Sequence, residues 1–169
     1  RAAERKAEDK DTDGEKANSY FKLIWCYIDI KDFIKGKSSA DSIIALIGVS
    51  SAIKDDAIGR KAYILYLEGN YADAKIGYDK VINSSDSLTS SKAEAYIHKS
   101  TALVKENNKN DALNNLKSVF NLDIKNVGVD LLKIAFSEIL AIQLDVITDW
   151  KEYCNWLTGI SSKLPSEPQ

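Results

Sequence analysis

The chain has 169 residues, of which 44% are apolar and 28% are charged, and its net charge is −2. These values are ordinary for a globular domain, and because basic residues are not in excess they exclude a strongly basic nucleic-acid-binding surface. Two prolines and eight glycines are too few for the turns of a β-rich fold of this size, so we expect long helices joined by short loops.

The ends of the chain differ from its middle. Residues 1–16 carry many charges of both signs and no apolar stripe, which predicts a charged linker or a frayed helix. We predict a flexible tail over residues 161–169. The chain begins with Arg and contains no Met, which suggests a fragment or a processed product. No apolar run reaches the roughly 18 residues of a membrane span, so we expect no direct membrane insertion.

Between residues 17 and 160 the apolar residues recur at steps of three and four, the spacing of helices. We predict a first helix over 18–35, which Gly36 ends, and a second helix that Ser38 or Ser39 begins. The further predicted helices lie at 55–68, directly after Gly69-Asn70, after the Ser-rich loop 84–91, after Asn107-Asn108, at 128–144 and over the last apolar stripe, which ends at Ile160.

These eight helices form four hairpins in which small residues follow the turns. Ala40, Ala74 and Ala112 stand at nearly equal intervals, and the Ser-rich loop would absorb the greater length of the second interval. Because no single hairpin can bury its apolar face alone, neighbouring hairpins must stack. Gly77 in the fourth helix has two interpretations, a tolerated exposed position or a close contact between helices.

The segment from Ala62 to Ile82 resembles a tetratricopeptide repeat. The family pattern has a small residue in the first helix, Gly-x-Tyr at the turn, then Ala and an aromatic residue in the second helix. In this chain the pattern is filled by Ala62, Gly69, Tyr71, Ala74 and Tyr78, with Val81 in place of the last Ala. The next unit keeps Tyr96, Ser100, Ala112 and Val119, the first keeps Ala40, and the last has Trp150 at the turn-aromatic place and Tyr153 where a small residue is expected. The closing Pro is missing throughout.

The resemblance implies an all-α, right-handed superhelical array of about four antiparallel helix hairpins with a concave groove. The residues that it places in the groove are Lys22, Trp25, Asp29, Gly59, Tyr63, Tyr66, Glu94, Ile97, Thr101 and Lys105. For Tyr63 and Tyr66 a place in the core is the alternative. The basic and Asn clamp with which one subfamily holds chaperone C-termini is absent, because the matching positions carry Trp25, Asp29, Gly59 and Tyr63.

The last helix is apolar, and no polar cap follows it. We therefore expect a second surface near the C-terminus, covered by a partner, a second copy or the tail. Its residues are Trp150, Trp156, Leu157 and Ile160.

Residues that could carry chemistry are few. The single histidine, His98, has no nucleophile or acid placed beside it in the sequence, and Asp29 and Asp32 fit a solvated helix face better than a metal or acid–base pair. Cys26 and Cys154 lie within apolar patterns and are interpreted as reduced core thiols. We expect no catalytic residue, metal or cofactor.

The sequence therefore predicts a non-catalytic scaffold or adaptor that binds a peptide or protein segment in its groove, and no nucleic acid. The alternatives are a self-assembling structural oligomer and a regulatory or anchoring domain of a larger, membrane-tethered protein. For location, the cytoplasm is favoured over the soluble part of a membrane-anchored protein.

Overall fold

The computed structural model describes residues 12–146 and 150–161, and these residues form nine helices and no strand. The predicted all-α class, with successive helices packed in antiparallel pairs, is confirmed. The contacts divide the chain into two compact units, unit 1 over residues 1–87 and unit 2 over residues 88–169.

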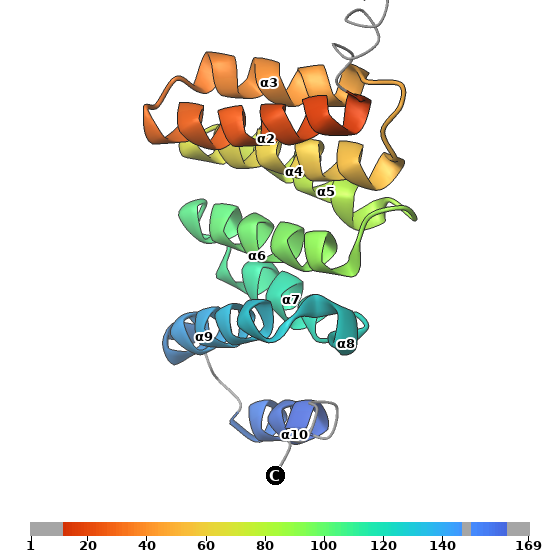
Figure 1. Ribbon diagram of the computed structural model, residues 1–169. Coiled ribbons are helices and arrows are strands. Elements are labelled where there is room, and N and C mark those ends of the chain that lie inside the picture. The colour runs from red at the N-terminus through yellow and green to blue at the C-terminus, as the bar shows by residue number, and fades with distance from the viewer. Residues whose placement is uncertain (1–11, 147–149, 162–169) are drawn as a thin grey trace, which may run out of the picture. The chain divides into compact units, whose positions relative to one another are not determined.

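Unit 1 contains two helix hairpins. The first is α2 with α3 and the second is α4 with α5, and α3 also packs against α4 (Figure 1, red to yellow-green). The helices are α2 (Asp13–Asp29), α3 (Phe33–Ala45), α4 (Ser51–Leu67) and α5 (Tyr71–Asn83).

Unit 2 begins with a third hairpin and continues with three further helices. In it, α6 packs against α7, and α9 packs against both. The helices are α6 (Thr89–Lys105), α7 (Lys109–Val119), the single turn α8 (Ile124–Val127), α9 (Val129–Val146) and α10 (Trp150–Ser161). The short helix α8 is not predicted by the sequence pattern.

The three hairpin turns share one backbone conformation. Lys31, Gly69 and Asn107 each have a positive φ, of 59°, 81° and 61°. In each turn the next residue donates its backbone N–H to a carbonyl five residues earlier, at 2.9 Å, which closes the preceding helix with a Schellman motif. That next residue also begins the following helix, because its side chain accepts a hydrogen bond from the backbone N–H three residues on. The three capping residues are Asp32, Asn70 and Asn108.

The hairpins repeat with a constant period. The residues before α2, α4 and α6 are Thr12, Ser50 and Leu88, which are equally spaced in the sequence, and each of these helices is 17 residues long. The capping residues of the second helices, at positions 32, 70 and 108, have the same spacing. A constant period means that a side chain in one hairpin can be compared directly with its counterparts in the other two.

The predicted position of the first turn is wrong. The turn lies at Lys31-Asp32, and Gly36, which was expected to end the first helix, lies inside α3 and is buried. The counterpart of Ala74 and Ala112 is therefore Gly36 and not Ala40. With this correction the small residues after the three turns are equally spaced in the sequence. Gly36 lies where α3 meets α4: a Cβ built on it would lie 2.9 Å from Cδ1 of Ile64, so the end of the Ile64 side chain would have to shift to make room.

A small pair closes the second hairpin. A Cβ on Gly77 would lie 2.7 Å from the Cβ of Ala62, which is 1% exposed. Of the two interpretations of Gly77, the close helix contact is the one observed. Tyr78 and Val81, one and four residues further along α5, are both 1% exposed.

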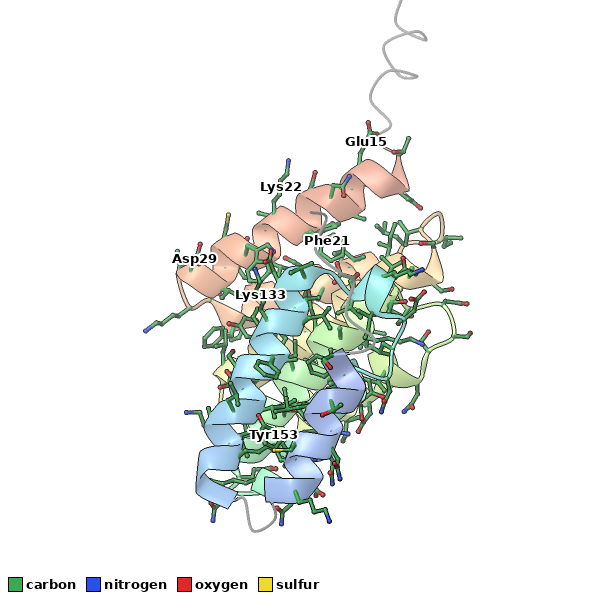
Figure 2. All side chains as sticks on the ribbon, turned by 90° about the horizontal axis from the view of Figure 1, so that it is seen from below. Glu15, Phe21, Lys22, Asp29, Lys133 and Tyr153 are labelled. Carbon is green, nitrogen blue, oxygen red and sulfur yellow. The ribbon has the colours of Figure 1, made fainter. Side chains whose placement is uncertain are left out.

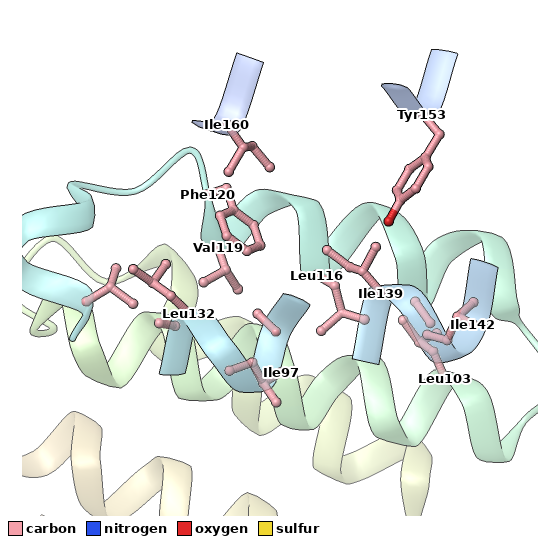
Figure 3. Packing of buried hydrophobic residues seen from close by; sticks show 14 residues of the cluster. Ile97, Leu103, Leu116, Val119, Phe120, Leu132, Ile139, Ile142, Tyr153 and Ile160 are labelled. Atoms are coloured by element: carbon pink, nitrogen blue, oxygen red, sulfur yellow. The ribbon is translucent and has the colours of Figure 1, made fainter. Parts of the chain in front are cut away.

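Each unit has its own apolar core. In unit 1 the fully buried side chains include Ile24, Ile43 and Ile64. In unit 2 the core joins α6, α7 and α9, and Figure 3 shows Leu116 and Ile139 at its centre, with Ile160 of α10 next to Phe120.

One further expectation, that of two core thiols, needs correction. Cys26 and Cys154 are free, but both are exposed and neither is a core residue. Residues 1–16 were predicted as a charged linker or a frayed helix: residues 13–16 form the first turn of α2, where Thr12 and Glu15 make a capping box, and residues 1–11 lie outside the described residues. The predicted tail from residue 162 onward lies outside the described residues.

Candidate functional site

Four aromatic rings form a row across three helices of unit 1. The ring of Trp25 in α2 lies 6.3 Å from that of Tyr63 in α4, and Tyr63 stacks on Tyr66 at 6.2 Å with an angle of 17° between the planes. Tyr66 lies 5.6 Å from Tyr71, the first residue of α5. We call these four residues the aromatic ladder.

The repeat explains how the ladder forms. Tyr63 and Tyr66 are three residues apart and so share one face of α4. Trp25 is the counterpart of Tyr63 in the first hairpin, exactly one period earlier, so the contact between α2 and α4 places it beside Tyr63. Tyr71 is brought to Tyr66 by the tight turn at Gly69-Asn70.

A cation completes the row. The guanidinium of Arg60 lies over the Trp25 ring, 4.9 Å from its centroid, and the Arg60 Nε is 3.5 Å from the Asp56 carboxylate. Burial raises the pKa of the Asp56 carboxyl, and the charge of Arg60 partly offsets this effect. An arginine over an indole face is a favourable cation–π arrangement that also holds the ring in place.

The ladder is anchored on one side and open on the other. Trp25 is 43% exposed, while Tyr63 and Tyr66 are half-buried. Tyr78, which is 1% exposed, lies near both tyrosines: burial raises the pKa of Tyr78, and the charges of Tyr63 and Tyr66 raise it further. The arrangement is a fixed, partly exposed aromatic surface.

The structure brings only some of the predicted groove residues together. Trp25, Tyr63 and Tyr66 are brought together in the ladder, but Lys22 and Asp29 are exposed on α2 and point away from the other helices (Figure 2). The residues of α6 behave differently from one another: Glu94 and Thr101 are half-buried, Lys105 is exposed and Ile97 is 6% exposed within the core of unit 2. Gly59 faces Val81, with 3.7 Å between a Cβ built on it and Cγ2 of Val81.

The predicted C-terminal face packs within unit 2. Trp156 lies edge-on to Phe120 at 5.7 Å, stacks on Tyr153 at 5.9 Å and carries the Lys117 ammonium 5.5 Å from its centroid. Leu157 packs against the same core, and Ile160 is 5% exposed. The side chain of Trp150 lies outside the described residues.

Sequence reasoning missed Arg60 and Asp56. Arg60 is the counterpart of Lys22 in the second hairpin and lies one turn before Tyr63. The period of the repeat could therefore have identified it. Among the residues that the structure describes, no group of three or more His, Cys, Asp or Glu side chains could hold a metal ion. Asp32, considered beside Asp29 as a possible pair, caps α3 and accepts from the Lys35 backbone N–H at 3.2 Å.

Comparisons with protein-family models, with curated proteins and with solved structures returned no match. Within the described part of the chain, no helix has both the length and the apolar character needed to cross a membrane. The fold thus defines an all-helical array of sequential hairpins, consistent with a helical repeat.

Proposed function

We propose that this chain is a non-catalytic interaction module that binds an extended peptide or protein segment across the aromatic ladder of unit 1. The observation that carries the proposal is the 43% exposure of a tryptophan held between Arg60 and Tyr63. Tryptophan, tyrosine and arginine are the residues most enriched among those that dominate binding energies at protein interfaces.

The ladder suits a ligand with apolar or aromatic side chains. Its rings are already ordered by contacts with one another, so binding would cost little additional side-chain entropy. The Arg60–Asp56 pair at one end offers a charge of each sign to polar groups of the ligand. A segment that lies along Trp25, Tyr63 and Tyr66 would meet an apolar centre with a polar border, the usual organisation of an interface.

We also propose that the hairpins belong to the tetratricopeptide type. The close contact of Ala62 with Gly77 and the turn at Gly69 support the assignment. The interval from Ser50 to Leu88 is longer than the roughly 34 residues of that family, and we assign the difference to the connections between hairpins, residues 46–50 and 84–88. Because the chaperone clamp is absent, chaperone C-termini are not the ligands we propose.

Selection from a displayed library of random peptides, followed by calorimetric titration, tests this function. We expect the selected peptides to bind the wild-type chain and to lose roughly tenfold or more of their affinity for Trp25→Ala. Ile47→Ala, at a residue of unit 1 that is 94% exposed and outside the ladder, is the matched control and should bind normally. Failure to select any peptide, or equal binding to both variants, would contradict the proposal.

The alternative of self-assembly through the C-terminal face receives less support. Trp156, Leu157 and Ile160 have partners within unit 2, so this face already buries apolar surface without a second chain. Light scattering behind a sizing column, with Leu157→Glu beside the wild type, tests this alternative. Self-assembly through this face requires that the wild type is an oligomer and that the variant, while still folded, is a monomer.

A further inference from the structure

One face of α2 is the counterpart of a face that is covered in α4. The constant period matches the two helices position by position. We call the four residues concerned in α2 the outer α2 face. They are Ser19, Leu23, Cys26 and Ile30, and their counterparts in and after α4 are Ala57, Lys61, Ile64 and Glu68.

In α4 this face forms the interface with the preceding hairpin. Ala57 and Ile64 are both 0% exposed, and Ile64 lies against Gly36 of α3. The two charged positions are each matched by α3: the ammonium of Lys61 is 2.7 Å from the Asp41 carboxylate, and the carboxylate of Glu68 is 2.6 Å from the Lys37 ammonium. The face is therefore a surface on which helices pack in this fold.

In α2 the same face is open among the described residues. Leu23 is 40% exposed, Ile30 is 69% exposed, and Cys26 is also exposed. The charged positions of α4 are apolar here, because Leu23 stands where Lys61 does and Ile30 where Glu68 does. A helix like α3 would place an aspartate and a lysine against these two residues, so the element that covers this face must be apolar at both points.

The outer α2 face is complementary to itself when two copies run antiparallel. Leu23 lies three residues before Cys26 and Ile30 four residues after it, so an antiparallel pair centred on Cys26 brings each Leu23 against the other chain's Ile30. Lys22 and Asp29 lie along one border of the outer α2 face, four residues before and three residues after Cys26. The pair thus also sets each Lys22 opposite the other chain's Asp29.

Opposite charges that match under a two-fold axis favour a second copy over other occupants. In the described structure Lys22 and Asp29 form no ion pair within the chain, and both project outward (Figure 2). We infer that α2 packs antiparallel on α2 of a second copy of this chain, with Leu23, Cys26 and Ile30 at the centre and two Lys22–Asp29 pairs at the border. The inference does not depend on the ligand of the aromatic ladder.

Sedimentation velocity from micromolar to submillimolar concentration tests this dimer. We expect a reversible dimer whose dissociation constant rises roughly tenfold or more in Ile30→Glu, since a carboxylate would be buried against Leu23. Ile47→Glu, at a more exposed isoleucine of the same unit, is the matched control and should dimerise normally. Circular dichroism verifies that both variants keep their helices.

A charge exchange tests the antiparallel alignment itself. Lys22→Asp sets two carboxylates against each other and should weaken the dimer, while the double variant K22D/D29K should restore it. In a Cys154→Ser background, a short bis-maleimide crosslinker should join two chains through Cys26, and less so in Ile30→Glu. A wild type that is monomeric at all concentrations, or a dimer that Ile30→Glu leaves intact, would overturn the inference, and absence of rescue in the double variant would overturn the alignment.

Discussion

The glycine at position 77 gives the sharpest test of the packing between α4 and α5. In an exposed helix, Gly→Ala stabilises by about 1 kcal/mol because alanine loses less backbone entropy. At Gly77 the new Cβ would lie 2.7 Å from the Cβ of Ala62 and 3.5 Å from its Cα, so neither neighbour can rotate away. The helices would have to separate.

Overpacking of this kind costs about 1–3 kcal/mol. Since both closest atoms belong to or adjoin the backbone, we take the upper part of that range, and subtraction of the propensity gain leaves a net loss of about 1–2 kcal/mol for Gly77→Ala. In a chain of this length each kcal/mol shifts the melting temperature by about 2–4 °C.

Gly59 is the matched control, because it lies in the middle of α4. A Cβ there would be 3.7 Å from Val81 Cγ2, an ordinary contact, so Gly59→Ala should stabilise by about 0.5–1 kcal/mol. Thermal and urea unfolding of both variants measure the two signs. If Gly77→Ala were as stable as the wild type or more so, the close helix contact would be refuted.

Three further predictions concern single residues. Lys31→Gly should raise the free energy of unfolding by about 0.5–1 kcal/mol, because Lys31 holds a φ of 59° that glycine adopts without strain, and thermal unfolding measures this gain. Asp55→Ala should lower the free energy of unfolding by about 1–3 kcal/mol, because the buried Ser87 hydroxyl donates to Asp55 Oδ2 at 2.6 Å and would lose this acceptor. Asp55→Asn keeps an acceptor and should lose less stability, and urea unfolding measures both variants. Burial raises the pKa of Tyr78 above its ordinary 10.0, so the unfolded state ionises first and the stability contribution is lost as pH rises above that value. When the free energy of unfolding is measured against pH, it should therefore fall less steeply at high pH for Tyr78→Phe than for the wild type.

Much of the fold could be predicted from local sequence patterns. The apolar spacing gave the helices, and Gly69-Asn70 and Asn107-Asn108 marked two of the three turns, because glycine and asparagine tolerate a positive φ. The first turn was misplaced because Lys31 carries no such signal, whereas Gly36 resembles a helix end. The reason for Gly36 is its contact with Ile64 in the next hairpin, which no local pattern contains.

The candidate site was predicted only in part, again because some of its contacts join residues that are far apart in the sequence. Trp25, Tyr63 and Tyr66 could be found from the repeat, but the cation over Trp25 comes from another helix, and its residue, Arg60, is visible only once the period is set correctly. The exposure of Cys26 also depends on context. Its counterpart Ile64 is buried because α3 covers it, and no described helix precedes α2 to do the same.

The most direct test of the central claim is to map a selected peptide on the chain by NMR. Titration of the isotope-labelled protein should shift the indole resonance of Trp25 and the ring resonances of Tyr63, Tyr66 and Tyr71 together, with the guanidinium of Arg60. Shifts that saturate at these residues, and are lost in Trp25→Ala, are the predicted result. A peptide that binds while these resonances stay unchanged would contradict the assignment of the aromatic ladder as the binding surface.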